Sequence, residues 1–66
     1  MKRFYEVYLN GRLIRVCAAD DPVEAYKKTC KVNKFPVLIM KDMNRNETYK
    51  VTRHYGIQTT YSVESV

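Results

Sequence analysis

Two runs in which apolar and polar residues alternate flank the dipeptide Asn10-Gly11 near the start of the chain. A type I′ turn requires a positive φ at both central residues, and Asn followed by Gly tolerates this requirement best. The pattern therefore predicts an antiparallel hairpin over 4–18 with a two-residue loop. In this register Leu9 pairs with Arg12, and the pairing continues without interruption to both strand ends.

The predicted hairpin has two unlike faces, because neighbouring side chains on a strand point to opposite sides of a sheet. One face is nearly all apolar and is expected to pack on the core: Tyr5, Val7, Leu9, Ile14, Val16 and Ala18. The other face is mixed in character: Phe4, Glu6, Tyr8, Leu13, Arg15 and Cys17. The register also opposes Glu6 to Arg15 and so predicts an ion pair across the strands.

The segment after the hairpin carries the signals of a helix start. Asp21 can cap the free amides, Pro22 suits the first helical position, and Glu24 follows the cap by three residues, as in a capping box. The predicted helix runs from about Pro22 to Val32 and ends before Pro36, which cannot continue it. Its apolar stripe is Val23, Tyr26 and Cys30, and its lysines Lys27, Lys28, Lys31 and Lys34 lie away from that stripe.

A second hairpin is predicted over 37–54, with strands at 37–41 and 48–54 joined by an Asn-rich turn. A symmetric turn pairs Met40 with Tyr49 and Leu38 with Val51, and these residues are expected to join the core. The residues between them extend the mixed face: Val37, Ile39, Lys41, Thr48, Lys50, Thr52 and His54.

The order of these elements predicts an α+β fold of the type ββαββ, with one helix on one face of an antiparallel four-stranded sheet in the order 2-1-3-4. An order with the second and third strands adjacent and parallel is the alternative. For the tail at 57–63 several outcomes stay open: a fifth strand along an edge, a strand that pairs with another chain, a cover over the mixed face, or a loose segment. We expect a single domain over 1–63 and disorder over 64–66.

With 66 residues, the core is expected to be thin, because a chain of this size buries only about 60% of the surface that its unfolded form exposes. Marginal stability or a stabilising partner follows. The two cysteines lack the spacing of a disulfide framework or a zinc site, so we expect both to be reduced, on opposite sides of the sheet. Together with the expected absence of a signal peptide and of a membrane span, this predicts a cytoplasmic protein.

Little in the sequence indicates catalysis. His54 is the only histidine, and with two glycines the chain has no glycine-rich phosphate loop. The adjacent carboxylates Asp20 and Asp21 are explained more simply by helix capping. We therefore expect a protein that is not an enzyme, with no cofactor, no metal and no small-molecule substrate.

The layout resembles that of several unrelated small proteins, among them compact inhibitors made by bacteriophages. The resemblance lies in the hairpin, the helix entry at 19–25 and the returning strand pair, and it covers topology only. It carries no functional residue onto this chain.

Charge and the mixed face lead to two functional hypotheses. Twelve Lys and Arg against seven Asp and Glu give a net charge of +5, which favours an acidic partner or serves solubility alone. The first hypothesis is a protein-binding module, a small regulator or phage-type inhibitor, that contacts an acidic protein or a second copy of itself. Its binding residues are Phe4, Tyr8, Leu13, Val37 and Ile39 as anchors, with Arg15, Lys41 and Lys50 to orient the partner. The alternative is nucleic-acid binding through Lys27, Lys28, Lys31, Lys34, Arg45 and Arg53.

Overall fold

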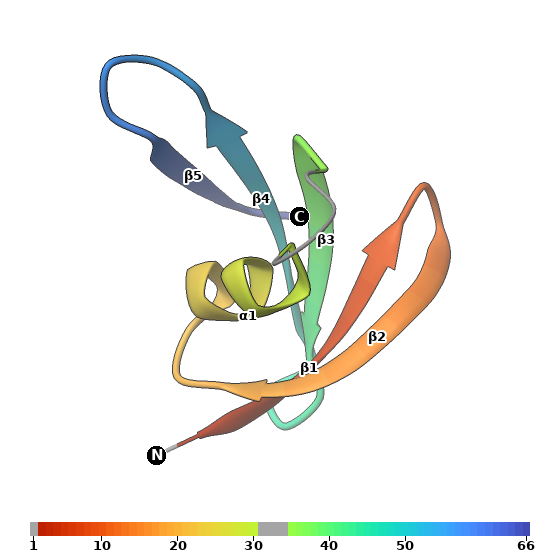
Figure 1. Ribbon diagram of the computed structural model, residues 1–66. Coiled ribbons are helices and arrows are strands. Elements are labelled where there is room, and N and C mark those ends of the chain that lie inside the picture. Colours follow the sequence, from red (N-terminus) through yellow and green to blue (C-terminus); the bar gives the residue numbers. More distant parts are fainter. Residues whose placement is uncertain (1, 31–34) are drawn as a thin grey trace.

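The computed structural model describes residues 2–30 and 35–66 and shows one antiparallel sheet with one helix against it (Figure 1). The sheet has five strands in the order β2-β1-β3-β4-β5. The elements are β1 (Arg3–Leu9), β2 (Arg12–Ala19), α1 (Pro22–Thr29), β3 (Val37–Asp42), β4 (Glu47–His54) and β5 (Thr60–Ser65). The α+β class is thus confirmed, whereas the strand count is five rather than four, because the tail adds β5 after the second hairpin.

The tip of the first hairpin forms as predicted, but its register changes further along. Asn10 and Gly11 have φ values of 51° and 80°, and Leu9 lies opposite Arg12. A β-bulge then inserts one extra residue in β2, so that Val7 lies opposite Arg15. The predicted pairing of Glu6 with Arg15 is therefore wrong.

The bulge exchanges the two faces of β2. Cys17 and Ala19 are buried beneath the helix, whereas Val16, expected in the core, is 50% exposed. Arg15 points to the helix side, where its Nη1 donates to the Lys28 carbonyl at 2.8 Å. This carbonyl lies in the last turn of α1, where carbonyls have no amide of the same helix to bond. In the shifted register, the Arg15 side chain supplies the missing donor.

The start of α1 has the predicted cap. The Asp21 carboxylate accepts from the Glu24 amide at 2.8 Å, and the Glu24 carboxylate accepts from the Asp20 amide at 3.3 Å. Lys28 Nζ lies 3.3 Å from the same Glu24 carboxylate and lowers its pKa. The end expected near Val32 falls partly outside the described residues; the described part of the helix ends at Thr29, with Cys30 as its cap.

The β3–β4 hairpin has the predicted register, with Met40 opposite Tyr49 and Leu38 opposite Val51. Its turn is held by Asp42, which is fully buried. Asp42 Oδ1 accepts from the amides of Asn44 and Arg45 at 2.9 and 3.2 Å. Arg3 Nη1 lies 3.7 Å from Oδ2, so the charge of this buried carboxylate is partly compensated by β1.

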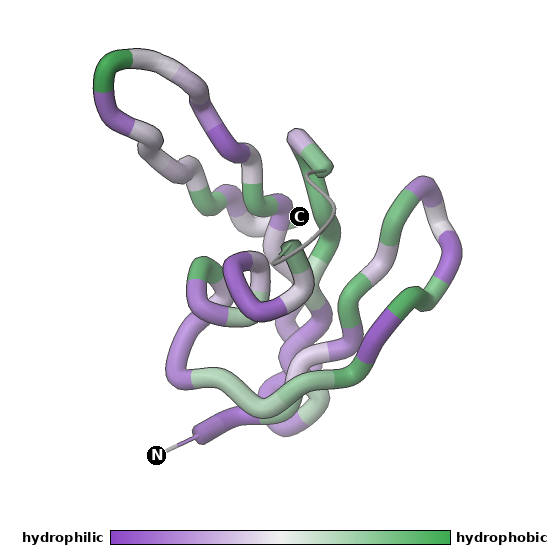
Figure 2. The backbone as a smooth tube through the Cα atoms, in the orientation of Figure 1, coloured by the Kyte–Doolittle hydropathy of each residue, from purple (hydrophilic) through white to green (hydrophobic). Residues whose placement is uncertain are grey.

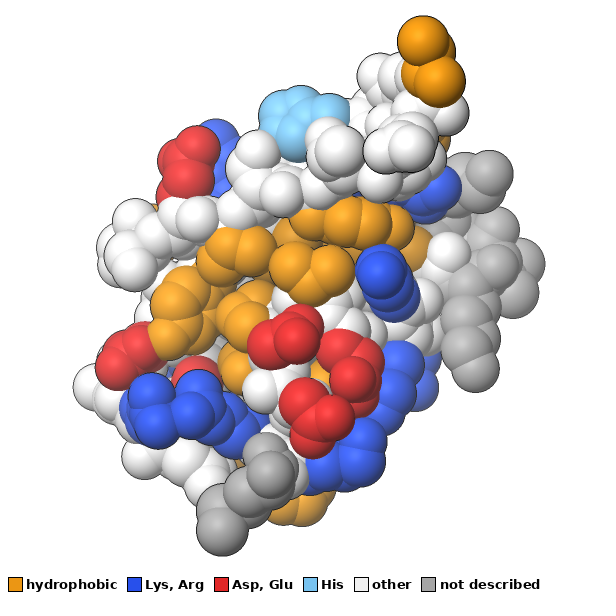
Figure 3. Space-filling model, turned by 90° about the vertical axis from the view of Figure 1, so that its left-hand side faces the viewer, with side chains coloured by type: hydrophobic (Ala, Val, Ile, Leu, Met, Phe, Trp, Pro, Cys, Tyr) orange, Lys and Arg blue, Asp and Glu red, His pale blue; other side chains and the backbone are white. Residues whose placement is uncertain are grey.

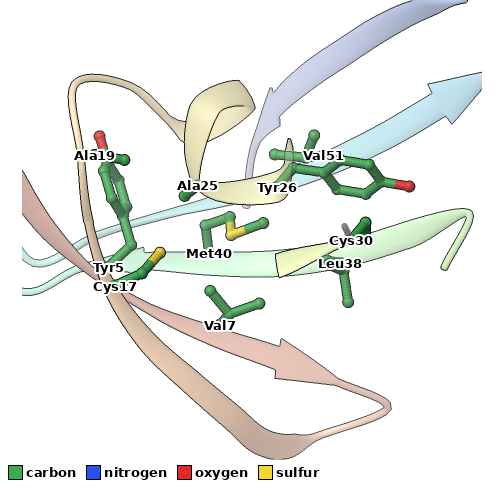
Figure 4. Packing of buried hydrophobic residues seen from close by; sticks show 10 residues of the cluster. All are labelled: Tyr5, Val7, Cys17, Ala19, Ala25, Tyr26, Cys30, Leu38, Met40 and Val51. Carbon is green, nitrogen blue, oxygen red and sulfur yellow. The ribbon is translucent and has the colours of Figure 1, made fainter. Parts of the chain in front are cut away.

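The core lies between α1 and one face of the sheet (Figure 4). Figure 2 shows hydrophobic positions along β3 and in the β1–β2 hairpin, but of those in β2 only Cys17 and Ala19 belong to the core, whereas Leu13, Ile14 and Val16 are exposed. Cys17 and Cys30 are both free and buried, at opposite ends of this one core, and not on opposite sides of the sheet as expected. The cluster is Tyr5, Val7, Cys17, Ala19, Ala25, Tyr26, Cys30, Leu38, Met40 and Val51.

The tail forms the edge strand β5 and does not fold over the mixed face. Glu64 pairs with Lys50, and the Val66 amide donates to the Thr48 carbonyl at 3.0 Å, so the pairing along β4 continues to the last residue. The Tyr61 ring packs edge-on against Tyr26 of α1, with ring centroids 5.5 Å apart. This contact packs β5 against α1.

Candidate protein-binding face

The side of the sheet opposite α1, here called the open face, carries no helix or strand over it within the described residues. It differs from the predicted mixed face in β2, where the bulge has exchanged residues, and in the added residues of β5. Its members on the first three strands are Phe4, Glu6, Tyr8, Leu13, Val16, Ala18, Val37, Ile39 and Lys41. Those on the last two strands are Thr48, Lys50, Thr52, His54, Thr60, Ser62 and Glu64.

Large apolar side chains lie bare on the β1–β2 half of the open face. Phe4 is 53% exposed, Leu13 47% and Val16 50%, while Tyr8 and Ile39 beside them are half-buried. Tyr8 has Leu13 as its neighbour on β2 and Ile39 on β3, so the three side chains form one row across the strands. Monomeric proteins seldom expose adjoining apolar side chains of this size without a binding role.

The structure brings together most of the predicted anchors and removes one orienting residue. Val37 and Ile39 share the open face with Phe4, Tyr8 and Leu13, as expected. Arg15 does not, because the bulge turns it toward α1. Val16 takes its place and was missed, since the apolar residues of β2 occupy both alternations and no periodic signal marks which ones are covered.

The charges of the open face form balanced cross-strand neighbours. Lys41 lies opposite Glu6 in the β1–β3 register, and Lys50 lies opposite Glu64 in the β4–β5 register. The face therefore carries two basic and two acidic side chains, so its own charge is near zero. The net charge of +5 therefore does not come from the strand residues of this face.

Local hydrogen bonds order two polar groups of the open face. The Tyr8 hydroxyl donates to the Glu6 carboxylate at 3.3 Å, and loss of solvent together with this negative neighbour raises the pKa of Tyr8. His54 Nε2 lies 2.5 Å from the Ser62 hydroxyl oxygen on β5. Lys41 lies opposite Glu6 in the register, and within the described residues no further side-chain hydrogen bond joins either pair to a third group.

The described basic residues of the nucleic-acid hypothesis make different contacts from one another. Lys27 lies over the Tyr61 ring, 5.2 Å from its centre, and Lys28 donates to the Ala18 carbonyl at 2.7 Å. Arg53 stacks on Tyr55, and Arg45 lies in the β3–β4 turn, away from the helix. Lys31 and Lys34 lie outside the described residues. Of the described cations, Lys27 and Arg53 both adjoin Tyr61, and Arg45 lies in the β3–β4 turn.

Other chemistry finds little support in the described part of the chain. Over 2–30 and 35–66, His, Cys, Asp and Glu side chains do not gather in groups of three that could hold a metal ion. The same residues include no helix with the length and apolar character needed to cross a bilayer. An open hollow lies at the hairpin tip on the helix side, lined by Leu9, Asn10, Arg12 and Ile14.

Comparisons with protein-family models, with curated proteins and with solved structures gave no match for this chain.

Proposed function

We propose that this chain is a non-enzymatic protein-binding module, a small regulator or inhibitor that contacts its partner through the open face. The observation that carries the proposal is the row of Leu13, Tyr8 and Ile39, with Phe4 and Val16 beside it, on a sheet surface that the fold leaves uncovered. Aromatic and aliphatic anchors surrounded by polar groups are the composition typical of the centre of a protein interface.

The net charge of +5 favours an acidic partner in this proposal. Since the open face is itself balanced, the charge acts at long range and raises the rate of encounter rather than the strength of the final contacts. Lys41 and Lys50 then orient the partner locally, each beside its acidic neighbour. Rising salt should therefore slow association and leave the dissociation rate nearly unchanged.

A photo-crosslinking amino acid tests the proposal in cells that naturally produce the chain. Placed at Leu13 or Ile39, it should capture one and the same protein; placed at Lys27 on the helix, it should not. The captured protein, once purified, should bind Tyr8→Ala at least about tenfold more weakly than the parent chain. Circular dichroism melts should show that Tyr8→Ala still folds cooperatively, with a loss of stability of about 1 kcal/mol, as for other half-buried side chains of the open face.

Three results would contradict the proposal. One is equal capture from Lys27 and from the open-face positions. Another is full affinity of Tyr8→Ala for the captured protein. The third is tight binding of single- or double-stranded nucleic acid near physiological salt with a steep salt dependence, which would favour the alternative function.

A further inference from the structure

The two edges of the sheet differ in how their unpaired backbone groups are treated. At the β2 edge, a bulge interrupts the strand, and Lys28 Nζ donates to the Ala18 carbonyl at 2.7 Å. Arg12 and Arg15 add positive charge along the same strand. Bulges, cationic side chains and covered carbonyls are the means by which proteins prevent a further strand from pairing at an edge.

Within the described residues the β5 edge has neither a bulge nor a side chain bonded to its outward carbonyls, although Lys27 of α1 lies over the Tyr61 ring on the helix side. Its register with β4 is unbroken over all of Thr60–Ser65, and the strand contains no proline, no lysine and no arginine. Glu64 is its one ionisable acid, and Glu64 points to the open face opposite Lys50. A regular strand of this kind offers a template for one more strand.

Two hydrogen bonds identify the backbone groups of β5 that point outward at this edge. The Val66 amide donates to the Thr48 carbonyl, and the Arg53 amide donates to the Pro36 carbonyl, on the β3 side. In an antiparallel ladder, inward and outward residues alternate. The amides and carbonyls of Tyr61, Val63 and Ser65 therefore point away from β4, and within the described residues no backbone hydrogen bond to them is found.

We propose that β5 pairs antiparallel with β5 of a second copy of the chain, which joins two sheets into one continuous sheet. The strand is self-complementary in side chains as well as backbone. Tyr61 and Val63 point to the helix side, where Val63 is 43% exposed, and Ser62 and Glu64 point to the other side. Symmetric registers centred on Ser62 or Val63 keep these sides together and place Glu64 opposite Thr60 or Ser62, never opposite the other Glu64.

The charge of β5 and the exposed apolar area beside it favour a second copy of the chain as the partner of this edge. Two chains of +5 repel each other over most of their surfaces, but this edge brings no cation of one copy directly opposite a cation of the other. On the flank that Figure 3 faces, hydrophobic side chains form an exposed strip. Pairing places the half-exposed Val63 of each copy beside apolar side chains of the other copy. The dimer therefore buries apolar area that the thin core of one chain leaves exposed.

Sedimentation velocity tests the dimer over about 10 µM to about 1 mM, a range suited to a small and therefore weak interface. The parent chain should shift from 7.8 kDa toward twice that mass as concentration rises. Val63→Pro removes an outward amide without removing a bond to β4, so it should stay monomeric. Val63→Thr keeps the amide and the β-branched shape and is the matched control, which should dimerise.

Amide hydrogen exchange on the parent chain gives a readout that needs no variant. Raising the concentration over the same range should slow exchange at the outward amides of Tyr61, Val63 and Ser65. The inward amides of Ser62 and Glu64 are already bonded to β4 and should change little.

A chain that stays at 7.8 kDa throughout, or a Val63→Pro variant that dimerises like the parent, would overturn the inference. So would a dimer that is lost in Leu13→Ser and kept in Val63→Pro, because that result would place the contact on the open face. A chain that stays monomeric leaves the partner-binding proposal for the open face untouched, whereas a dimer that depends on Leu13 would make the second copy the partner of that face.

Discussion

The two faces of the sheet are made from the same strands, yet one face is buried and the other is partly exposed. On β3, Leu38 and Met40 lie beneath α1 at 1% and 0% exposure, while Ile39 between them lies on the open face, half-buried. The difference arises because the single helix, with eight residues, covers only one side. In a chain this short, the face beneath the helix therefore carries most of the buried apolar area, and the open face carries little of it.

The largest test of this comparison is a matched pair of substitutions on β3. Met40→Ala should lower the free energy of unfolding by about 2–5 kcal/mol, because it opens a cavity in the core. Ile39→Ala should cost about 1 kcal/mol, since the open face loses area without forming a cavity. Urea titration followed by circular dichroism measures both. If Met40→Ala does not fold, Met40→Leu keeps the volume and should cost less than about 1.5 kcal/mol.

The second test uses thiol chemistry to read the shifted register of β2. Cys17 is buried beneath α1, so it should react with a thiol reagent at least about tenfold more slowly in the native state than in urea. Val16→Cys, with both native cysteines replaced by Ala, should react at nearly the same rate in both states. Fast labelling of Cys17 in the native state would contradict the bulge and support the register without it.

The third test compares tyrosines of the two faces at high pH. Burial and the neighbouring Cys30 raise the pKa of Tyr26 to about 12. The folded state therefore keeps its proton above the unfolded value of 10.0, so stability is full below pH 10 and falls as pH rises toward 12. Tyr26→Phe should reduce this alkaline loss, although it also removes the hydroxyl that donates to the Phe35 carbonyl.

Tyr8 provides the control for the alkaline measurement. Its side chain lies on the open face and only partly out of solvent, so Tyr8→Phe should leave the alkaline loss close to that of the parent chain. Urea midpoints at pH 8 and pH 11 separate the variants. A larger change from Tyr8→Phe than from Tyr26→Phe would contradict the assignment of the two faces.

The smallest expected effect concerns Arg15, which sequence analysis placed on the open face. Arg15→Ala removes the bond to the Lys28 carbonyl and should cost about 0.5–1.5 kcal/mol. Arg12→Ala, at an exposed position on the same strand, should change stability by less than about 0.5 kcal/mol. Equal effects would show that the contact with α1 contributes nothing.

The two hairpins explain how much of the fold could be predicted from the sequence. In β4, apolar Tyr49 and Val51 alternate with Lys50 and Thr52, and a symmetric turn then gives Leu38 and Val51 as partners, as observed. In β2, by contrast, Leu13 and Ile14 are adjacent apolar residues, and so are Val16 and Cys17. Because a shift of one residue exchanges the faces at little apolar cost, packing against α1 decides the register.

The same reasoning applies to the candidate site. Phe4 and Tyr8 were placed correctly because burial of Tyr5 and Val7 fixes the faces of β1, and Val37 and Ile39 because the second hairpin has the predicted register. Leu13 was placed correctly because it precedes the bulge. Arg15 was misplaced and Val16 missed because they follow it. That β5 pairs along β4, rather than covering the open face, depends on tertiary contacts such as Tyr26 with Tyr61, which no local pattern encodes.

Asp42 sets a narrow limit on which sequences can keep this fold. Its short carboxylate accepts two turn amides while it lies fully buried near Arg3. Asn offers a carbonyl oxygen at the same reach, Glu is one methylene too long, and an apolar residue leaves both amides without an acceptor. In a saturation library sorted for folded chains, this position should accept Asp, tolerate Asn and reject the remaining amino acids.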